Sequence, residues 1–313
     1  MPNRMQETIG HVTLDYMYYP GEDLYSDGPV EDKLLHIARN YRENQLNKVI
    51  AQEKSWPVLY HFSHLRWNIV DWIPFTKEDH VLEIGAGSGM LTQALAERVK
   101  HVTAVELDRE MIPYLKVAVL NCPNVTVVHA DILRFDWQAF AEEHGAFHIA
   151  ANLPYHVTTA LLTRLTELDL PIQSMHLMLQ KESAEKLCAG PGEEGYGPLT
   201  LRLQWEYEPE IRKYLPREVF TPPPRVDSAF ISLTRKSAPP AQVSDEKKLF
   251  EVIKAAFALR RKTLLNNLMN RYGLNRKQTL AWLSSASIPE NARAEQLGIE
   301  AFVELANLMR REE

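Results

Sequence analysis

Three glycines follow a short apolar run directly, and this order is typical of a loop that holds a ligand against the backbone. Gly85, Gly87 and Gly89 come after Val81–Ile84, and a helical pattern begins behind them. Glycine lets the backbone approach a ligand at the end of a strand, and the following helix contributes the positive end of its dipole. Because many nucleotide-binding folds share such a loop, the glycines predict a nucleotide-like ligand without defining its chemistry.

Two acidic residues follow where further strands are expected to end. Glu106 closes the run Val102–Glu106, about 20 residues after the glycines, where a carboxylate accepts both hydroxyls of a ribose. Asp131 follows a third run and is suited to accept a hydrogen bond from an adenine amine. Glycines, then Glu, then Asp on successive strand ends indicate a site for S-adenosylmethionine. A dinucleotide oxidoreductase, or acids that only cap helices, are the alternatives.

A fourth expected strand ends in Asn152-Leu153-Pro154-Tyr155, which is suited to methylation of a planar exocyclic amine. The nitrogen lone pair of such an amine is conjugated into the ring, so the nitrogen is a weak nucleophile. The Asn152 side-chain oxygen and the carbonyl of Leu153 or Pro154 would bind both amine hydrogens and favour a tetrahedral nitrogen. Pro154 fixes the backbone, and Tyr155 offers a ring on which an extruded base stacks. The alternative is a proline-stiffened turn with a packing tyrosine.

Alternating strand and helix patterns must position these residues. From about residue 65 to 235, β-branched runs alternate with helical stretches, which indicates βαβ units and a mostly parallel sheet. Two later runs, 211–215 and 229–233, are expected to pair antiparallel at the sheet edge. We therefore predict an α/β fold of the class I methyltransferase kind, with a Rossmann-like, seven-stranded, mostly parallel sheet and helices on both faces. The earlier runs are 81–84, 102–106, 125–128, 147–150 and 175–179.

Composition divides the chain into three parts. Residues 1–55 form an acidic, tyrosine-rich N-terminal extension, with a helical run expected over about 31–53. Residues 56–238 form the predicted S-adenosylmethionine-binding catalytic domain. A proline-containing linker precedes residues 239–313, which carry no strand signal and are expected to form a small helical domain.

The net charge of −6 does not exclude a nucleic-acid substrate, because the charge is unevenly distributed. Residues 1–33 carry a net charge of −5, so the remainder is nearly neutral and can hold basic patches. No stretch reaches the ~18 uncharged apolar residues of a membrane helix, and no signal pattern opens the chain. Cys122 and Cys188 are too few for a disulfide framework or a zinc site, so we expect a cytoplasmic protein without a metal.

Several longer motifs resemble the ribosomal RNA adenine dimethyltransferases, a family that joins the small-subunit dimethylases with the erythromycin-resistance methylases. The resemblance covers roughly residues 78–310, and Leu259–Leu268 and Ile288–Leu297 resemble the small-subunit branch in particular. The motifs that carry the wider resemblance are Asn152-Leu-Pro-Tyr, Met178-Leu-Gln-Lys-Glu, Ala189-Gly-Pro-Gly, Tyr196-Gly-Pro-Leu and Phe220-Thr-Pro-Pro-Pro-Arg-Val-Asp-Ser-Ala.

The resemblance implies transfer of two methyl groups to the N6 amine of each of two adjacent adenines in small-subunit ribosomal RNA, by an enzyme expected to be monomeric. It also implies that Phe220 forms the second face of the base pocket, opposite Tyr155, with a core role for Phe220 as the alternative. Basic residues would face RNA phosphates, where each contact adds salt-dependent affinity, and a solvated helix face is the alternative. These candidates are Arg260, Arg261 and Lys262, with Arg225 and Lys181 as weaker ones.

The sequence departs from the family ahead of the first strand of the sheet. The family's Gly-Gln-Asn-Phe-Leu segment closes over the methionine end of the cofactor, whereas residues 59–66 read Leu-Tyr-His-Phe-Ser-His-Leu-Arg. Phe62 is expected to keep the aromatic role, and His61 or Tyr60 to replace the polar contacts. The candidate cofactor contacts are His61, Phe62, Glu83, Gly85, Ala86, Gly87, Glu106, Leu107, Asp131, Ile132 and Asn152.

Two alternatives to this function stay open, and the first of them depends on the N-terminal extension. If residues 1–55 formed an acidic lid rather than a docking element, they would repel RNA phosphates and favour a methyltransferase of the same fold that acts on a small molecule or a glycan amine. The second alternative is a non-catalytic RNA-binding or ribosome-assembly protein. The presence of Gly87, Glu106 and Asn152 argues against it.

Overall fold

The computed structural model describes residues 72–153, 155–219, 224–259 and 261–309, and, before these, residues 6–9, 12–15 and single or paired positions between 36 and 70. The chain divides into two compact units, Met1–Pro74 and Phe75–Glu313. The helical run predicted over 31–53 lies largely outside the described residues.

The first unit contains a short hairpin that was not predicted. From the sequence, this segment was expected only to form an acidic extension. Strands β1 (Gln6–Ile9) and β2 (Val12–Asp15) pair antiparallel, with Gln6 opposite Asp15 and Ile9 opposite Val12. The signal that could have indicated it is local, because β-branched residues flank a two-residue connection that contains Gly10.

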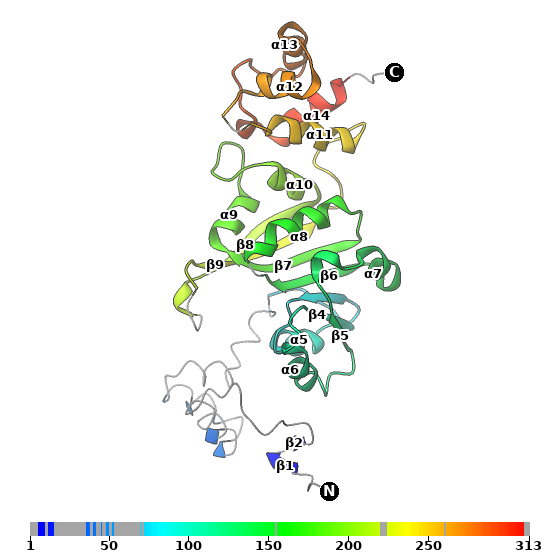
Figure 1. Cartoon of the computed structure of the whole chain (residues 1–313), viewed down its shortest axis with the longest axis vertical. Helices are drawn as coiled ribbons and strands as arrows, with labels where there is room; N and C mark the ends of the chain where they lie inside the picture. Colours follow the sequence, from blue (N-terminus) through cyan, green and yellow to red (C-terminus); the bar gives the residue numbers. More distant parts are fainter. Residues whose placement is uncertain are drawn as a thin grey trace. The chain divides into compact units, whose positions relative to one another are not determined.

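Seven strands of the second unit form one sheet, in the order β5-β4-β3-β6-β7-β9-β8 (Figure 1). The first five are parallel, and β9 runs antiparallel to both β7 and β8. The predicted seven-stranded, mostly parallel sheet with an antiparallel pair at its edge is therefore confirmed. Its strands are β3 (His80–Ile84), β4 (His101–Glu106), β5 (Val125–His129), β6 (Phe147–Asn152), β7 (Ile172–Gln180), β8 (Tyr207–Leu215) and β9 (Ser228–Arg235).

Helices cover both faces of the sheet, as predicted. On one face, Leu115 of α6 packs against Ala86 and Ala104. On the other, side chains of α7 and α8 share a core with Leu82 and Ile149. The helices and 3₁₀ turns beside the strands are α5 (Met90–Ala96), α6 (Met111–Ala118), η2 (Ile132–Arg134), α7 (Trp137–His144), α8 (Tyr155–Glu167), α9 (Lys181–Cys188), α10 (Pro198–Glu206) and η3 (Arg217–Val219).

The C-terminal part is helical, as predicted, but its core reaches back into the preceding segment. It contains α11 (Glu246–Ala256), α12 (Leu264–Tyr272), α13 (Arg276–Ser285), η4 (Ala294–Gln296) and α14 (Ile299–Leu308). Tyr196, Leu201 and Trp205 are buried in the same cluster as Leu249 and Phe302. Apolar side chains that precede the linker therefore complete the core of the C-terminal helices.

Polar side chains define where three of the C-terminal helices begin, and a glycine defines where one of them ends. Asp245 accepts hydrogen bonds from two backbone N–H groups in the first turn of α11, and Thr263 accepts one in the first turn of α12. Asn275 and Gln278 form a reciprocal capping box at the start of α13. Gly273, with φ of +65°, ends α12 in the left-handed region.

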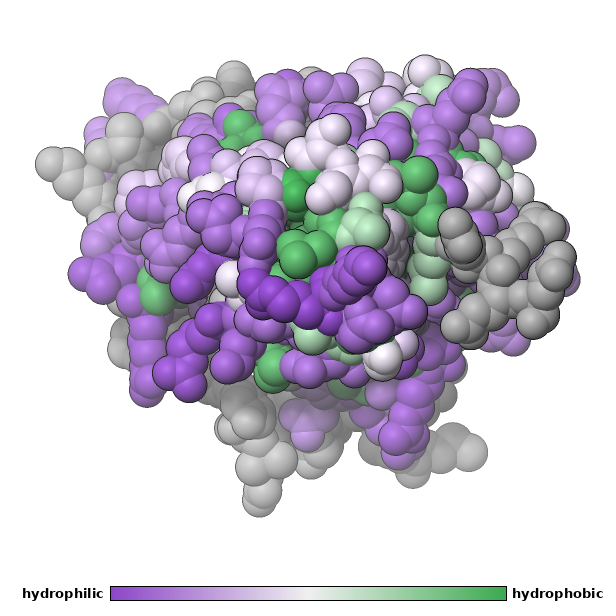
Figure 2. All heavy atoms as spheres, turned by 90° about the horizontal axis from the view of Figure 1, so that it is seen from above, coloured by the Kyte–Doolittle hydropathy of each residue, from purple (hydrophilic) through white to green (hydrophobic). Residues whose placement is uncertain are grey.

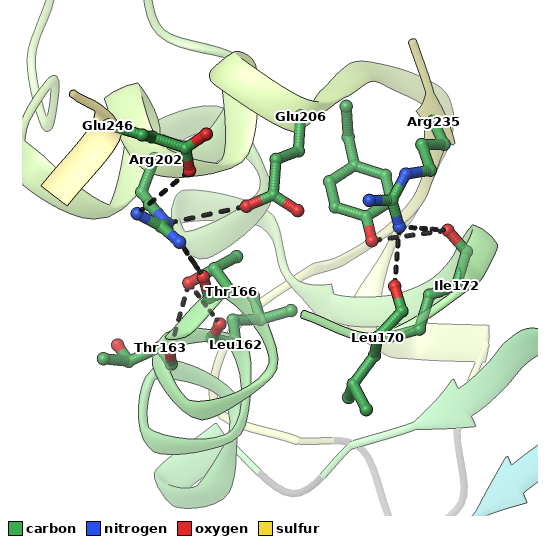
Figure 3. A network of polar contacts seen from close by, with 10 residues as sticks. Leu162, Thr163, Thr166, Leu170, Ile172, Arg202, Glu206, Arg235 and Glu246 are labelled. Atoms are coloured by element: carbon green, nitrogen blue, oxygen red, sulfur yellow. Dashed lines mark hydrogen bonds and ion pairs between the residues drawn. The ribbon is translucent and has the colours of Figure 1, made fainter. Parts of the chain in front are cut away.

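Arg202 of α10 joins three helices (Figure 3). Its guanidinium donates two hydrogen bonds to the carbonyl of Thr166 near the end of α8, one of them at 2.8 Å. It also lies 3.5 Å from Glu206 and 3.7 Å from Glu246 of α11. The same guanidinium stacks 3.7 Å from the centre of the Phe250 ring. One side chain thus links the sheet helices to the first C-terminal helix.

A second arginine in Figure 3 fixes the start of β7. Arg235, the last residue of β9, donates to the carbonyl of Leu170 at 2.6 Å and to that of Ile172 at 3.4 Å. The Tyr207 hydroxyl also donates to the Ile172 carbonyl, at 3.4 Å. Backbone acceptors at this strand end are therefore satisfied by side chains.

A chain of hydroxyl and imidazole groups crosses one face of strands β6, β7 and β9. Ser174 lies 2.7 Å from His148 and 2.7 Å from His176, and Ser232 lies 2.9 Å from the other ring nitrogen of His176. Asp79 lies 3.5 Å from the remaining nitrogen of His148. Burial, together with positive charge on His148 and Arg212, lowers the pKa of His176 to about 3.

This chain of groups predicts a loss of stability on acidification. The folded state holds His176 neutral, whereas in the unfolded chain the imidazole binds a proton from its ordinary pKa of 6.5 downward. Stability is therefore complete above that pH and falls until the folded-state pKa of about 3 is reached. Between pH 7 and pH 5 the expected loss from this residue is about 2 kcal/mol.

Urea unfolding at pH 7 and pH 5, followed by tryptophan fluorescence, tests this expectation. Replacement of His176 by glutamine should reduce the difference between the two unfolding free energies by about 2 kcal/mol. Comparing the two pH values within each variant removes any constant effect of the substitution on packing. An equal loss in the wild type and in His176→Gln would show that other groups determine the acid response.

No helix in the described ranges is long and apolar enough to cross a membrane.

Figure 2, which looks onto the end at which α13 lies, shows a largely hydrophilic surface with a small hydrophobic area.

Candidate functional site

The parallel order of the sheet brings the sequence motifs to one edge. Neighbouring strands β5, β4, β3 and β6 end, respectively, just before Asp131, at Glu106, just before Gly85 and at Asn152. Because the strands are parallel, these four ends lie at the same edge, which is where α/β proteins bind ligands. Residues separated by about 70 positions in the sequence thus form one candidate site.

The glycine loop holds a tight conformation that side chains would disturb. Its backbone is tied to β4, since the N–H of Gly85 donates to the Val105 carbonyl at 2.9 Å. At Gly89, with φ of +87°, a Cβ atom would lie 2.9 Å from the Leu115 side chain and 3.0 Å from that of Ala118. At Gly87, with φ of +55°, a Cβ atom would meet nothing within 4 Å in the described part of the chain. The loop is thus packed against α6 at Gly89, whereas the space next to Gly87 is open.

Glu106 connects the glycine loop to the end of β4. One carboxylate oxygen accepts the N–H of Gly87 at 2.7 Å, and the other accepts the N–H of Asp108 at 2.8 Å. The residue is 8% exposed, so the carboxylate is held in place with only a small surface open to a ligand. Both oxygens keep a further lone pair for ligand hydroxyls.

Asp131 has a structural role as well as a candidate ligand role. One oxygen accepts the N–H of Leu133 at 2.9 Å and caps the η2 turn, and the other lies 3.7 Å from the exposed Arg134 guanidinium. Of the neighbouring candidates, Ile132 is buried in the core, whereas Leu107 is 63% exposed. Leu107 is therefore an apolar surface beside the two acids, open to a ligand ring.

Glu83 is a buried carboxyl on the strand that leads into the glycine loop. It is 1% exposed, and one oxygen has no hydrogen-bond partner among the residues that the structure describes. Burial, with a smaller contribution from the negative charge of Glu106, raises the pKa of Glu83 to about 8. The carboxyl is therefore mostly protonated at neutral pH, and its buried oxygen without a partner is costly; a cationic group on a ligand would favour the charged form and relieve that cost.

Asn152 stands at the end of β6 with its side chain exposed. A Cβ atom on Gly85 would lie 3.6 Å from the Asn152 carbonyl, so the glycine loop and Asn152 are direct neighbours. Leu153 is 2% exposed and its N–H donates to the Met178 carbonyl at 3.3 Å, which anchors the turn in the core. Tyr155 is the first residue of α8, and the predicted roles of its side chain and of Pro154 fall outside the described part of the chain.

The candidate RNA contacts lie apart from the sheet edge motifs in the sequence. Arg225, Arg261 and Lys262 are exposed. Lys181 begins α9, and its ammonium lies 5.6 Å from the centre of the Tyr214 ring. His61, Phe62, Phe220 and Arg260 are outside the described residues.

A groove between two helices of the sheet domain was not singled out from the sequence. It lies between α8, α9 and the Tyr196-Gly-Pro-Leu motif, and has a volume of about 370 Å³. That motif carries part of the family resemblance, but the sequence gives no role to its residues or to Lys186, which lines the groove. Within the described ranges, no cluster of three or more metal-binding side chains is present.

The family model and two of the sequence relatives that match this chain are named as ribosomal RNA methyltransferases or dimethylases. A family model described as "Ribosomal RNA adenine dimethylase" matches residues 64–311. The chain is 42% identical over 248 residues to "Ribosomal RNA small subunit methyltransferase A" of Geobacillus thermodenitrificans, covering 77% of this chain and 85% of the relative. The protein of the same name from Enterococcus faecalis is 40% identical over 250 residues, covering 77% and 84%.

Solved structures agree with the sequence comparison. A dimethyladenosine transferase from Plasmodium falciparum has a TM-score of 0.66 at 25% identity, over 78% of this chain and 94% of that structure. The 23S rRNA methyltransferase ErmE has a TM-score of 0.61 at 25% identity, over 79% of this chain and 97% of that structure.

Proposed function

The chain belongs to the ribosomal RNA adenine dimethylase family, and from that premise we propose that it dimethylates adenine N6 amines in small-subunit RNA through the residues of the carboxyl sheet edge. It is an S-adenosylmethionine-dependent methyltransferase that acts on ribosomal RNA. The small-subunit target is supported by its relatives of about 40% identity, which are named for that subunit.

The observation that carries the assignment of the site is the contact between the glycine loop and Asn152. A Cβ atom built on Gly85 would lie 3.6 Å from the main-chain carbonyl oxygen of Asn152, and this proximity supports a site in which the loop binds the nucleotide and Asn152 binds the amine. A methyl donor on the loop and an acceptor amine at Asn152 would therefore be neighbours, which is what direct transfer requires.

The residues present fit S-adenosylmethionine. The carboxylate of Glu106 is fixed by two backbone N–H groups and suited to ribose hydroxyls, and the space above Gly87 is open for close backbone approach. Glu83 has an oxygen without a partner among the described residues and a pKa of about 8, so a positively charged ligand group beside it would favour the ionised carboxylate and pair with it. When bound, this cofactor supplies an electrophilic methyl group on a sulfonium. The wider set of contacts is Glu83, Gly85, Ala86, Gly87, Glu106, Leu107, Asp131, Ile132 and Asn152, with His61 and Phe62 closing the methionine end.

The chain's own residues would hold the amine rather than deprotonate it. The Asn152 side-chain oxygen accepts one amine hydrogen, and the carbonyl of Leu153 or Pro154 accepts the other. The anchoring of Leu153 in the core fixes that turn. Tyr155 and Phe220 enclose the base between two rings. Rate enhancement comes from position and fixed dipoles.

The proposal also assigns the residues that bind RNA and a role to each part of the chain. Arg225, Arg260, Arg261 and Lys262 bind phosphates around the target, and three of them are exposed where described. Residues 1–55, 56–238 and 239–313 act as extension, catalytic domain and helical RNA-binding domain. The enzyme works as a monomer on its substrate.

Methyl transfer to undermodified small ribosomal subunits tests this function. The protein is incubated with labelled S-adenosylmethionine and subunits, and the modified nucleotides are mapped and hydrolysed to nucleosides. The expected product is N6,N6-dimethyladenosine at two adjacent positions. Label in a small molecule or protein, or no label at all, would refute the proposal.

A further inference from the structure

The groove between α8 and α9 is lined by two helices that begin at the same sheet edge as the candidate active site. Helix α8 begins three residues after Asn152, and α9 begins directly after β7, whose Met178 is paired with Asn152 in the sheet. Thr158, Thr159 and Leu162 of the first turns of α8 form one wall of the groove. Both helices that line the groove therefore start beside the strand ends to which the target base is assigned.

The lining of the groove combines apolar side chains with hydroxyl groups. Leu162, Leu187, Leu199 and the Phe257 ring supply apolar area, and Thr159 and Ser183 supply hydroxyls. Its volume of about 370 Å³ is within the range of small-ligand pockets. Apolar walls with a few polar groups are what a nucleobase needs, since its faces stack and its edges hydrogen-bond.

Charge distinguishes this groove from the cavity next to it. Among the described residues that line the groove, Lys186 is the one charged side chain. The neighbouring cavity, of about 190 Å³, shares Tyr196 and Phe257 but is lined by three glutamates and one lysine. The groove therefore offers a phosphate a positive charge within its own lining, whereas in the cavity the three glutamates offset the charge of the lysine.

Lys186 is held by close packing rather than by an ion pair. A Cβ atom on Gly195 would overlap with the Cγ of Lys186, and Gly195 has φ of +87°, so the turn needs glycine both for its backbone and to approach the lysine stem. The carbonyl of Lys186 accepts a hydrogen bond from Thr200 at 2.9 Å, which ties the end of α9 to α10. No ion pair to Lys186 forms within the described ranges. Its ammonium is therefore available for a ligand anion.

We propose that this groove binds a second nucleotide of the RNA strand, adjacent to the adenine at Asn152, with its base against the apolar wall and its phosphate on Lys186. The proposal rests on the proposed RNA substrate and deepens it, because it identifies a site that fixes the register of the strand. A neighbouring base held there would define which adenine reaches Asn152.

A double-mutant cycle between protein and RNA tests the groove. The RNA is a synthetic hairpin with two adjacent loop adenines, prepared intact and with an abasic nucleotide on the 5′ or the 3′ side of each adenine. Thr159→Trp fills the groove from an exposed position. For the wild type, one abasic position should weaken binding about tenfold through lost stacking. For Thr159→Trp the same abasic change should cost less than about twofold, because the base no longer has a site.

Lys186→Gln provides a second and independent measurement. It should weaken binding several-fold and lower the salt dependence of log K by about one unit of slope. Lys100→Gln is the matched control, since Lys100 is an exposed lysine next to the amino end of β4, away from the carboxyl edge, and it should change neither quantity. Melting temperatures and S-adenosylmethionine affinity identify a variant that misfolds.

The outcomes separate this proposal from the proposed function. If the wild type methylates RNA but the Thr159→Trp and abasic effects multiply at every position tested, the groove holds no base and the proposal fails. An unchanged salt slope in Lys186→Gln would equally refute its phosphate contact. If the wild type methylates no RNA adenine, the proposed function itself fails.

Discussion

Asn152→Ala is expected to reduce methyl transfer to RNA by on the order of 100- to 1,000-fold, while affinity for S-adenosylmethionine changes only a few-fold. The reason is that the target nitrogen gains nucleophilicity only when its hydrogens are held out of the ring plane. Asn152 offers an exposed amide at the end of β6, beside the glycine loop. Single-turnover rates with saturating RNA, and calorimetry with the cofactor, measure the two quantities separately.

A matched control separates this effect from a general loss of an amide. Asn121 is an exposed asparagine in the turn before β5, at the amino edge of the sheet, and Asn121→Ala should leave the rate unchanged. Normal turnover by Asn152→Ala would exclude the acceptor role. A fall in cofactor affinity as large as the fall in rate would place Asn152 in cofactor binding alone.

Glu106→Ala is expected to weaken S-adenosylmethionine binding by roughly 100-fold, equivalent to about 3 kcal/mol from two charge-assisted hydrogen bonds. The loss has two sources. The ribose hydroxyls lose their acceptor, and the N–H groups of Gly87 and Asp108 lose the carboxylate that holds them at 2.7 and 2.8 Å. Calorimetric titration gives the dissociation constant directly.

Two further variants help to explain the loss of cofactor affinity expected for Glu106→Ala. Glu106→Gln keeps one accepting oxygen and should show an intermediate loss of about tenfold. Glu110→Ala removes an exposed acid at the start of α6 and should have no effect on the affinity. If Glu106→Ala bound the cofactor as tightly as the wild type, the carboxylate would have only the loop-fixing role seen in the structure.

The part of the fold that depends on periodic apolar patterns could be predicted from the sequence. Strands β3 and β4 are buried along nearly their whole length, and such strands appear as continuous β-branched runs. The ends of these runs predict that Gly85, Glu106 and Asn152 meet at one edge, and the sheet confirms it. The antiparallel pairing of β8 with β9 was also predicted from the sequence and is confirmed, although β8 begins at Tyr207 rather than at Ile211.

Features that depend on contacts between distant polar residues could not be predicted. The chain from His148 through Ser174 to His176 joins two strands, and a histidine in a strand pattern gives no sign of its partner. Asp131 has a capping contact, which the sequence suggests only as an alternative to ligand binding. The position of Lys186 over Gly195 depends on the path of the turn after α9, which local sequence does not determine.

The shared burial of Trp205 and Phe302 has a consequence for engineering. A chimera made by joining the last 75 or so residues of a relative at the proline-containing linker would leave Trp205, Leu201 and Tyr196 facing foreign side chains, and Arg202 would lose Glu246 and Phe250. Specificity in this family would therefore be transplanted most safely with α10 included. Because residues before and after the linker are in contact, a substitution on one side of it should be combined with a matching substitution on the other side.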